Sequence, residues 1–139
     1  MYLRKGLHIN ALGHLEIGGC DCVELAHEFG TPLYVYDEDY LRARCSGYTE
    51  ALKKYAPGGA AAYASKAFLT TAMAVIMKQC GMWLDCVSLG ELYVAKKAGF
   101  PAEHIIVHGS NKTDIELQTA LDMGVGRIVL DSTEEIERL

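Results

Sequence analysis

The feature that most constrains the fold of this chain is a unit repeated four times from Ala60 onward. Each unit consists of a short apolar segment, a polar turn and an amphipathic segment with helical spacing. The apolar segments predict strands over residues 61–65, 82–86, 104–107 and 127–130. The amphipathic segments predict helices over residues 68–79, 89–98, 113–123 and 133–139. Strands that alternate with helices favour a parallel sheet, so the α/β class is expected.

Residues that commonly begin and end helices fall at the ends of these segments. Glycine follows the first three predicted helices, as Gly81, Gly99 and Gly124. Three helices begin with a capping-box pair: Ser88 with Glu91, Thr113 with Glu116 and Ser132 with Glu135. Units of this even length fit a (β/α)8 (TIM) barrel, and four of them are half of one. An open doubly wound sheet fits the same pattern.

The residues before this repeat predict smaller elements. A β-hairpin is expected over residues 7–17, followed by a helix over residues 22–29 with Asp21 as its N-cap and Gly30 at its end. Residues 33–36 predict a further strand, and Asp37 a cap for a helix that reaches residue 55. Because an open half barrel would expose two sheet edges and an apolar interior, we expect this chain alone to be poorly stable, oligomeric or completed by another chain.

The composition excludes several classes of partner. Of the 139 residues, 50% are hydrophobic and 22% charged, as in an ordinary soluble domain. The formal net charge of −5, without a cluster of Lys or Arg, argues against binding to nucleic acid or to a membrane surface. The five cysteines include one close pair, Cys20 and Cys22, which lacks the spacing of a zinc or redox motif. Reduced thiols in the cytoplasm and no metal centre are therefore expected.

Three residues near the ends of the first three predicted strands are the main candidates for chemistry. In a (β/α)8 barrel the loops after the strands form the active face. Lys66 stands in the apolar stretch 59–69, and a lysine there needs a partner or a task, such as a Schiff base with an aldehyde cofactor. Asp85 could hold that lysine by its charge, and His108 could stack on the cofactor or hydrogen-bond to it. The alternatives are a lysine that reaches solvent, an acid satisfied by backbone donors and an ordinary loop histidine.

The segment Tyr63-Ala64-Ser65-Lys66-Ala67 resembles the pyridoxal-phosphate lysine motif of the alanine-racemase-like, or fold-type III, decarboxylases. Further similar stretches lie at residues 13–19, 24–26, 29–37, 84–92 and 108–112, so the resemblance covers nearly the whole chain. Within that family the sequence is most similar to the diaminopimelate decarboxylases. The order and spacing of these motifs together make the resemblance specific.

The resemblance implies that residues 31–139 form the first half of an alanine-racemase-type barrel and that residues 1–30 belong to a second, β-rich domain. Lys66 would be the catalytic residue that carries pyridoxal 5'-phosphate, with Asp85 and His108 in the same cofactor site. The family's phosphate loop, its acidic partner of the ring nitrogen and its substrate arginines lie further along the chain than residue 139. This piece alone is therefore expected to be inactive.

The activity implied is decarboxylation of meso-diaminopimelate to L-lysine and carbon dioxide, by a cytoplasmic homodimer with a shared active site. Three other substrates stay open: ornithine, arginine and carboxynorspermidine. An alternative hypothesis from a different functional class is a non-catalytic chain that binds pyridoxal phosphate, or a truncated inactive product.

Overall fold

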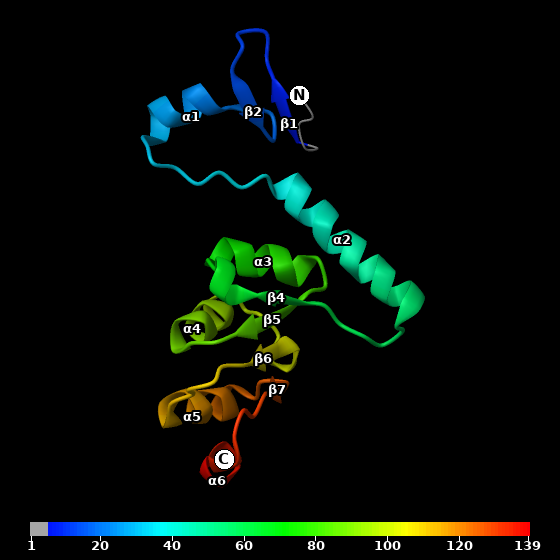
Figure 1. Ribbon diagram of the computed structural model, residues 1–139, viewed down its shortest axis with the longest axis vertical. Helices are drawn as coiled ribbons and strands as arrows, with labels where there is room; N and C mark the ends of the chain where they lie inside the picture. Colours follow the sequence, from blue (N-terminus) through cyan, green and yellow to red (C-terminus); the bar gives the residue numbers. More distant parts are fainter. Residues whose placement is uncertain (1–5) are drawn as a thin grey trace. The chain divides into compact units, whose positions relative to one another are not determined.

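The computed structural model describes residues 6–139 (Figure 1). Residues 1–5, part of the predicted N-terminal β segment, lie outside the described residues. The chain divides into two compact units, Met1–Gly47 and Tyr48–Leu139. No helix within residues 6–139 is long and apolar enough to cross a membrane.

The first unit begins with an antiparallel sheet followed by a helix. Its strands are β1 (Leu7–Ile9), β2 (Leu15–Ile17) and β3 (Cys20–Asp21), in the order β1-β2-β3. Helix α1 (Cys22–Phe29) follows directly and ends at Gly30. The predicted hairpin and first helix are both confirmed, because their turn and cap residues are local signals.

Asp21 joins the hairpin to helix α1. Its carboxylate accepts hydrogen bonds from the backbone N–H groups of Val23 and Glu24, at 2.7 and 3.3 Å. It also accepts one from Asn10 Nδ2 at 2.7 Å and lies 2.8 Å from Nδ1 of His14. Burial alone would raise the pKa of Asp21, but these hydrogen bonds outweigh it and lower the pKa to about 2.

We expect the first unit to lose stability in acid as Asp21 takes up a proton. The folded pKa of about 2 lies below the ordinary value of 3.8, so the unfolded chain binds the proton first. The stabilisation is complete above pH 3.8 and is lost as the pH falls through about 2. Carbon-detected NMR of the Asp21 carboxyl should give a midpoint near 2, and a midpoint near 3.8 would contradict this. Asp21→Ser, which retains a cap but does not titrate, should lack this contribution.

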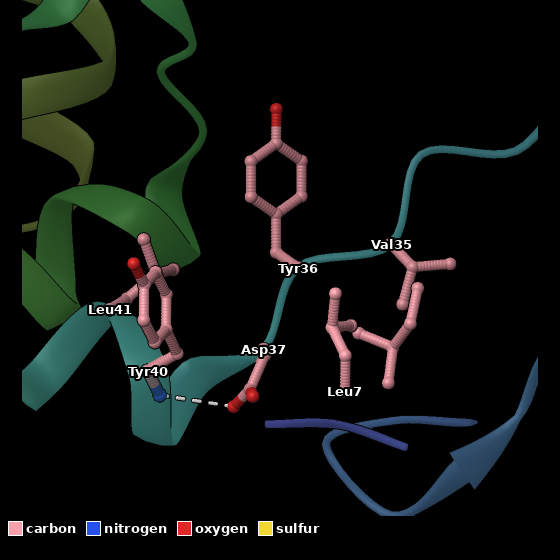
Figure 2. Close-up of a pocket in the computed structure, with 7 residues that line it drawn as sticks. Leu7, Val35, Tyr36, Asp37, Tyr40 and Leu41 are labelled. Carbon is pink, nitrogen blue, oxygen red and sulfur yellow. Dashed lines mark hydrogen bonds between the residues drawn. The ribbon is translucent and has the colours of Figure 1, made fainter. Parts of the chain in front are cut away.

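Helix α2 (Glu38–Tyr55) begins after Asp37, which caps it as predicted. The Asp37 carboxylate accepts the backbone N–H of Tyr40 at 3.0 Å, and Figure 2 shows this bond beside a cavity. The helix runs without a break through Gly47. The boundary between the two units falls at this glycine, inside the helix.

The prediction of a strand over residues 33–36 is wrong. Among the described residues this segment pairs with no strand, and Tyr34 is 88% exposed. Val35 instead lines a cavity of about 330 Å³ with Leu7 and Ile17, beside Asp37 (Figure 2). The apolar and aromatic residues of this segment alone do not make a strand, because a strand also needs a neighbour with free backbone groups.

The second unit is a parallel sheet with helices between its strands. The strands are β4 (Ala62–Ala64), β5 (Trp83–Cys86), β6 (Ile105–Val107) and β7 (Arg127–Ile128), in the order β4-β5-β6-β7. The α-helices are α3 (Thr71–Gln79), α4 (Leu89–Lys97), α5 (Asp114–Met123) and α6 (Thr133–Arg138). Two short 3-10 helices, η1 (Ser65–Ala67) and η2 (Ala102–His104), complete it. Each predicted strand and helix of the repeat is present, with somewhat shorter bounds.

The core of this unit lies on one face of the sheet. Along β5 and β6 the buried residues alternate with half-buried ones, as expected when only one face is covered. Leu84, Cys86 and Ile105 are fully buried, whereas Asp85 and Ile106 belong to the less covered face. Helices α3, α4 and α5 follow one another along the sheet, with α3 against α4 and α4 against α5 (Figure 1). The candidate residue Asp85 therefore faces away from this core.

The predicted helix ends are confirmed with one refinement. Gly81, Gly99 and Gly124 adopt positive φ angles of 70, 61 and 67° just past helices α3, α4 and α5. A complete capping box forms only at α5, between Thr113 and Glu116. At α4 and α6 the serine caps the helix, but the glutamate carboxylate accepts from the residue before the cap: Glu91 from Val87, and Glu135 from Asp131. Each of these two glutamates thus binds the loop that precedes its own helix.

Candidate functional site

Lys66 lies in the turn that directly follows strand β4. This turn, η1, is closed by Tyr63, whose hydroxyl donates to the carbonyl oxygen of Phe68 at 2.6 Å. The Lys66 side chain is exposed, and it makes no hydrogen bond or ion pair with any residue in the described part of the chain. Of the two interpretations of this lysine, the structure agrees with a side chain that reaches solvent, since the turn carries it out of the strand. What results is an accessible amine on a closed turn.

Ser65 anchors the other side of this turn to the sheet. It is only 2% exposed, and its hydroxyl lies 3.8 Å from the sulfur of Cys86 on β5. Burial raises the pKa of the Cys86 thiol to about 11, so this cysteine is a protonated packing group at neutral pH. The roles of Tyr63 and Ser65 could not be predicted from the sequence, because both act through contacts of the folded turn.

Alkylation should distinguish the five free cysteines by their burial. A rise in pKa from 9.0 to about 11 lowers the thiolate fraction of Cys86 about 100-fold, before its lack of access is counted. Cys20 is exposed and should react first, whereas the buried Cys45 and Cys86 should react last. Timed labelling with N-ethylmaleimide and peptide mass analysis measures this order, and denatured protein, with all five equally reactive, is the control. Labelling of Cys86 as fast as Cys20 would contradict the structure.

Asp85 and His108 lie together at the end of the neighbouring strands. Asp85 is on β5, opposite Ala64 of β4 and Ile106 of β6. Its side chain is 24% exposed, and the Nδ1 atom of His108 lies 3.8 Å from its Oδ1 atom. His108 follows β6 and continues the ladder, because its N–H donates to the carbonyl oxygen of Cys86 at 2.9 Å. The imidazole is 48% exposed, so it is open to solvent beside the carboxylate.

The Oδ1 atom of Asp85 is the one buried side-chain oxygen or nitrogen in residues 6–139 that lacks a hydrogen-bond partner. Such an atom is costly, because burial removes water without replacing its hydrogen bonds. Unpaired polar atoms of this kind are typical of sites that receive a ligand or an ion. Within the same part of the chain no group of three or more His, Cys, Asp or Glu side chains could hold a metal ion. An organic group that brings its own cationic or donor atom fits this carboxylate.

The three candidates thus come from neighbouring elements at one edge of the sheet. The turn with Lys66 lies against β5, and Lys66 is two residues past the partner of Asp85 in the register. Lys66 forms no ion pair with Asp85 among the described residues, whereas Asp85 and His108 do approach each other. Four further polar residues follow these strands and divide into two groups. Ser110 and Asn111 are exposed in the loop after β6, and Ser88 and Ser132 cap helices α4 and α6.

One further cluster beside this edge was missed from the sequence. Lys112 and Glu135 form a buried ion pair of 2.9 Å next to the loop that carries His108. Glu135 was read only as part of a capping box, and Lys112 only as the end of a motif. No spacing rule links the two, because they lie 23 positions apart on separate units of the repeat.

Comparison with known proteins places these features in a family. The family model for the pyridoxal-binding domain of pyridoxal-dependent decarboxylases matches residues 38–139. The diaminopimelate decarboxylase of Bacillus subtilis (strain 168) is 47% identical over 139 residues, which are 100% of this chain and 32% of that protein. The crystal structure of diaminopimelate decarboxylase from M. jannaschii in complex with L-lysine matches with a TM-score of 0.85 and 32% identity. That match covers 96% of this chain and 32% of the other.

A less similar structure is that of a lysine/ornithine decarboxylase from Vibrio vulnificus complexed with putrescine. It matches with a TM-score of 0.70 and 28% identity, over 84% of this chain and 31% of the other. The chain spans about a third of the length of the curated relatives it matches. These structural neighbours have the alanine-racemase-like fold. Of the two folds predicted from the sequence, the barrel is therefore the one supported, and the open doubly wound sheet is not. The chain therefore belongs to the family of pyridoxal-dependent decarboxylases, and it is similar to the N-terminal part of the diaminopimelate decarboxylases.

Proposed function

We propose that the intact protein decarboxylates meso-diaminopimelate to L-lysine and carbon dioxide, with pyridoxal 5'-phosphate as its cofactor. In this proposal the chain supplies Lys66, which holds the cofactor covalently through its amine, together with Asp85 and His108 beside it. The observation that carries the proposal is the accessible, unpaired amine of Lys66, which lies on a turn against β5, the strand of Asp85. The pyridoxal-binding family model spans all three residues, which supports this assignment.

The residues at the site suit such a cofactor. An aldehyde needs an amine that it can reach, and Lys66 is exposed. The unpaired Oδ1 atom of Asp85 offers a negative charge to any cationic nitrogen brought beside it. When bound, pyridoxal phosphate supplies a conjugated pyridine ring that accepts the electron pair released as carbon dioxide leaves.

The chain's own residues would prepare the site in separate ways. The closed turn from Tyr63 to Phe68 limits where the Lys66 amine can reach, so the cofactor is oriented by its attachment point. His108 would act at the Asp85 carboxylate, because its Nδ1 atom lies 3.8 Å from Oδ1. The Lys66 Nζ atom, once released from the cofactor, is the group on this chain suited to carry a proton at the site.

The preference for meso-diaminopimelate rests on similarity. Curated relatives that are 42 to 50% identical to this chain are diaminopimelate decarboxylases. Ornithine, arginine and carboxynorspermidine are the competing substrates, since substrate contacts would come from elsewhere in the intact protein. We further propose a homodimer with a shared active site and a cytoplasmic location, with no nucleic acid or membrane partner, in agreement with the net charge of −5.

Carbon dioxide release by the intact, cofactor-loaded protein tests this function. The four candidate amino acids are offered separately at equal concentration, and kcat/KM is measured for each. We expect the value for meso-diaminopimelate to exceed each of the others by at least about 100-fold, since a site that hydrogen-bonds a polar substrate group rejects analogues without it by about 10⁴-fold or more. A higher value for another substrate would contradict the specificity, and no release from any of them would favour a non-catalytic carrier.

A further inference from the structure

The buried ion pair between Lys112 and Glu135 has no place in the function proposed above. Its Nζ and Oε2 atoms lie 2.9 Å apart, and the two side chains are 3% and 5% exposed. The hydrogen bond from the Lys112 ammonium lowers the pKa of the Glu135 carboxyl, so this carboxyl is ionised at neutral pH. Together with Ser65 they are the only buried polar residues in residues 6–139.

This pair is unlike the surface ion pairs of the chain. Removing two charges from water costs several kcal/mol for each, and their attraction does little more than offset that cost. The pair therefore adds little to stability compared with apolar side chains of the same size. The best-supported use of such a pair is to select one arrangement of the chain over others.

The arrangement that the pair selects is that of the loop after β6. The Lys112 ammonium donates to the carbonyl oxygen of Gly109, which follows His108 directly. At the other end of the loop, Nη2 of Arg138 donates to the carbonyl oxygen of Lys112 at 2.7 Å. Glu135, in turn, is tied to its own loop by the N–H of Asp131 at 3.1 Å. Both ends of the loop from residue 109 to residue 112 are therefore held by groups at α6 or by the buried ammonium.

His108 is consequently held at its own N–H and, one residue further on, at the Gly109 carbonyl. Its N–H donates to Cys86 at 2.9 Å, and the carbonyl of the next residue, Gly109, accepts from Lys112. With the backbone held, the imidazole is directed to Asp85, where Nδ1 lies 3.8 Å from the unpaired oxygen. Without the ammonium, the Gly109 carbonyl would turn freely and this direction would be lost.

We propose that Lys112 is a positioning residue, which acts with Glu135 through the Gly109 carbonyl to hold His108 against Asp85. The unit formed by β7 and α6 thereby sets the geometry of the loop that follows β6. The catalytic consequence rests on the proposed function, but the geometric claim does not. Lys112 itself touches neither Asp85 nor Lys66 among the described residues.

The test uses the intact protein, one double variant and one control variant. Lys112→Met/Glu135→Leu replaces the pair by apolar side chains of similar size, which avoids a single buried charge. Lys78→Met is the matched control, because Lys78 also donates to main-chain carbonyls, those of Ala98 and Gly99, at 3.1 and 3.2 Å. Three quantities are measured: melting temperature, the imidazole resonances of His108 in cofactor-free protein, and the steady-state constants of the loaded enzyme.

The double variant should keep a melting temperature close to that of the wild type while the His108 resonances shift or broaden. Its kcat should fall about 10- to 100-fold, the size expected from misplacing a site residue by about 1 Å, with a smaller change in KM. Lys78→Met should leave the His108 resonances and kcat unchanged. Unchanged His108 resonances in the double variant, or an equal change in Lys78→Met, would overturn the proposal.

Two further outcomes also decide the matter. Should the double variant fail to fold, Arg138→Met removes the bond to the Lys112 carbonyl, together with the exposed ion pair of Arg138 with Asp114, while it keeps the pair of Lys112 and Glu135. This variant must then shift the His108 resonances in a folded protein, and their coincidence with the wild type would overturn the proposal. The resonances are recorded without cofactor, so a failure of Lys66 to bind pyridoxal phosphate would sink the proposed function and leave this test intact.

Discussion

Lys66→Ala in the intact protein is expected to lower kcat/KM for carbon dioxide release from meso-diaminopimelate by at least about 1,000-fold. Loss of the amine removes both the covalent attachment of the cofactor and the proton-carrying group on this chain. The Lys66 side chain is exposed and unpaired among the described residues, so its removal should change the free energy of unfolding by less than about 0.5 kcal/mol. The measurement is steady-state kinetics at saturating pyridoxal phosphate, with thermal unfolding in parallel.

Lys78→Ala is the control for this loss. Lys78 is another lysine of the same unit, but its ammonium donates to the carbonyls at the end of helix α4. Its removal should lower stability and leave kcat/KM nearly unchanged. Retention of more than a tenth of the activity in Lys66→Ala would show that the amine does not carry the reaction.

The largest effect on stability is expected for Gly126→Ala. A Cβ atom at this position would overlap the carbonyl group of Glu103, which is backbone and cannot turn aside. The close approach is fixed by the N–H of Gly126, which donates to the carbonyl oxygen of Ala102 at 2.9 Å just before β7. Overpacking of this kind costs about 1 to 3 kcal/mol, measured as the free energy of unfolding in urea.

Gly47→Ala provides the matched comparison, because the same methyl group is added where nothing lies within 4 Å. Gly47 is in the middle of helix α2, so alanine should stabilise by about 0.5 to 1 kcal/mol. The two substitutions should therefore have opposite signs. Equal stability of Gly126→Ala and the wild type would mean that η2 and β7 do not approach as described.

Much of the fold was predictable because its signals are local. Asp21 and Gly30 bound helix α1 through contacts with residues at most four positions away, and Thr113 caps α5 in the same way. The alternation of strands and helices was equally readable, since each short element carries its own periodicity. The prediction of a strand over residues 33–36 was wrong because pairing is not a local property. It depends on a neighbouring strand, which the periodicity of the segment itself does not reveal.

The site was predictable in part. The position of Lys66 at the end of β4 followed from the repeat, whereas its exposure depends on the turn that Tyr63 closes by its bond to Phe68. The buried pair of Lys112 and Glu135 could not be predicted from the sequence. The two residues are charged and lie 23 positions apart, so no pattern indicates that they are buried or in contact. The assignment of residues 1–30 to a separate β domain stays a prediction, as do the roles of Asp85 and His108.

Borohydride reduction of the protein after incubation with pyridoxal 5'-phosphate tests most directly the claim that Lys66 holds the cofactor. Reduction fixes the cofactor to whichever amine carries it, and peptide mass analysis then identifies the residue. We expect the phosphopyridoxyl group on the peptide that contains Lys66, and its absence from that peptide in Lys66→Ala. Labelling spread over exposed lysines such as Lys53 and Lys96, with none on Lys66, would contradict the account.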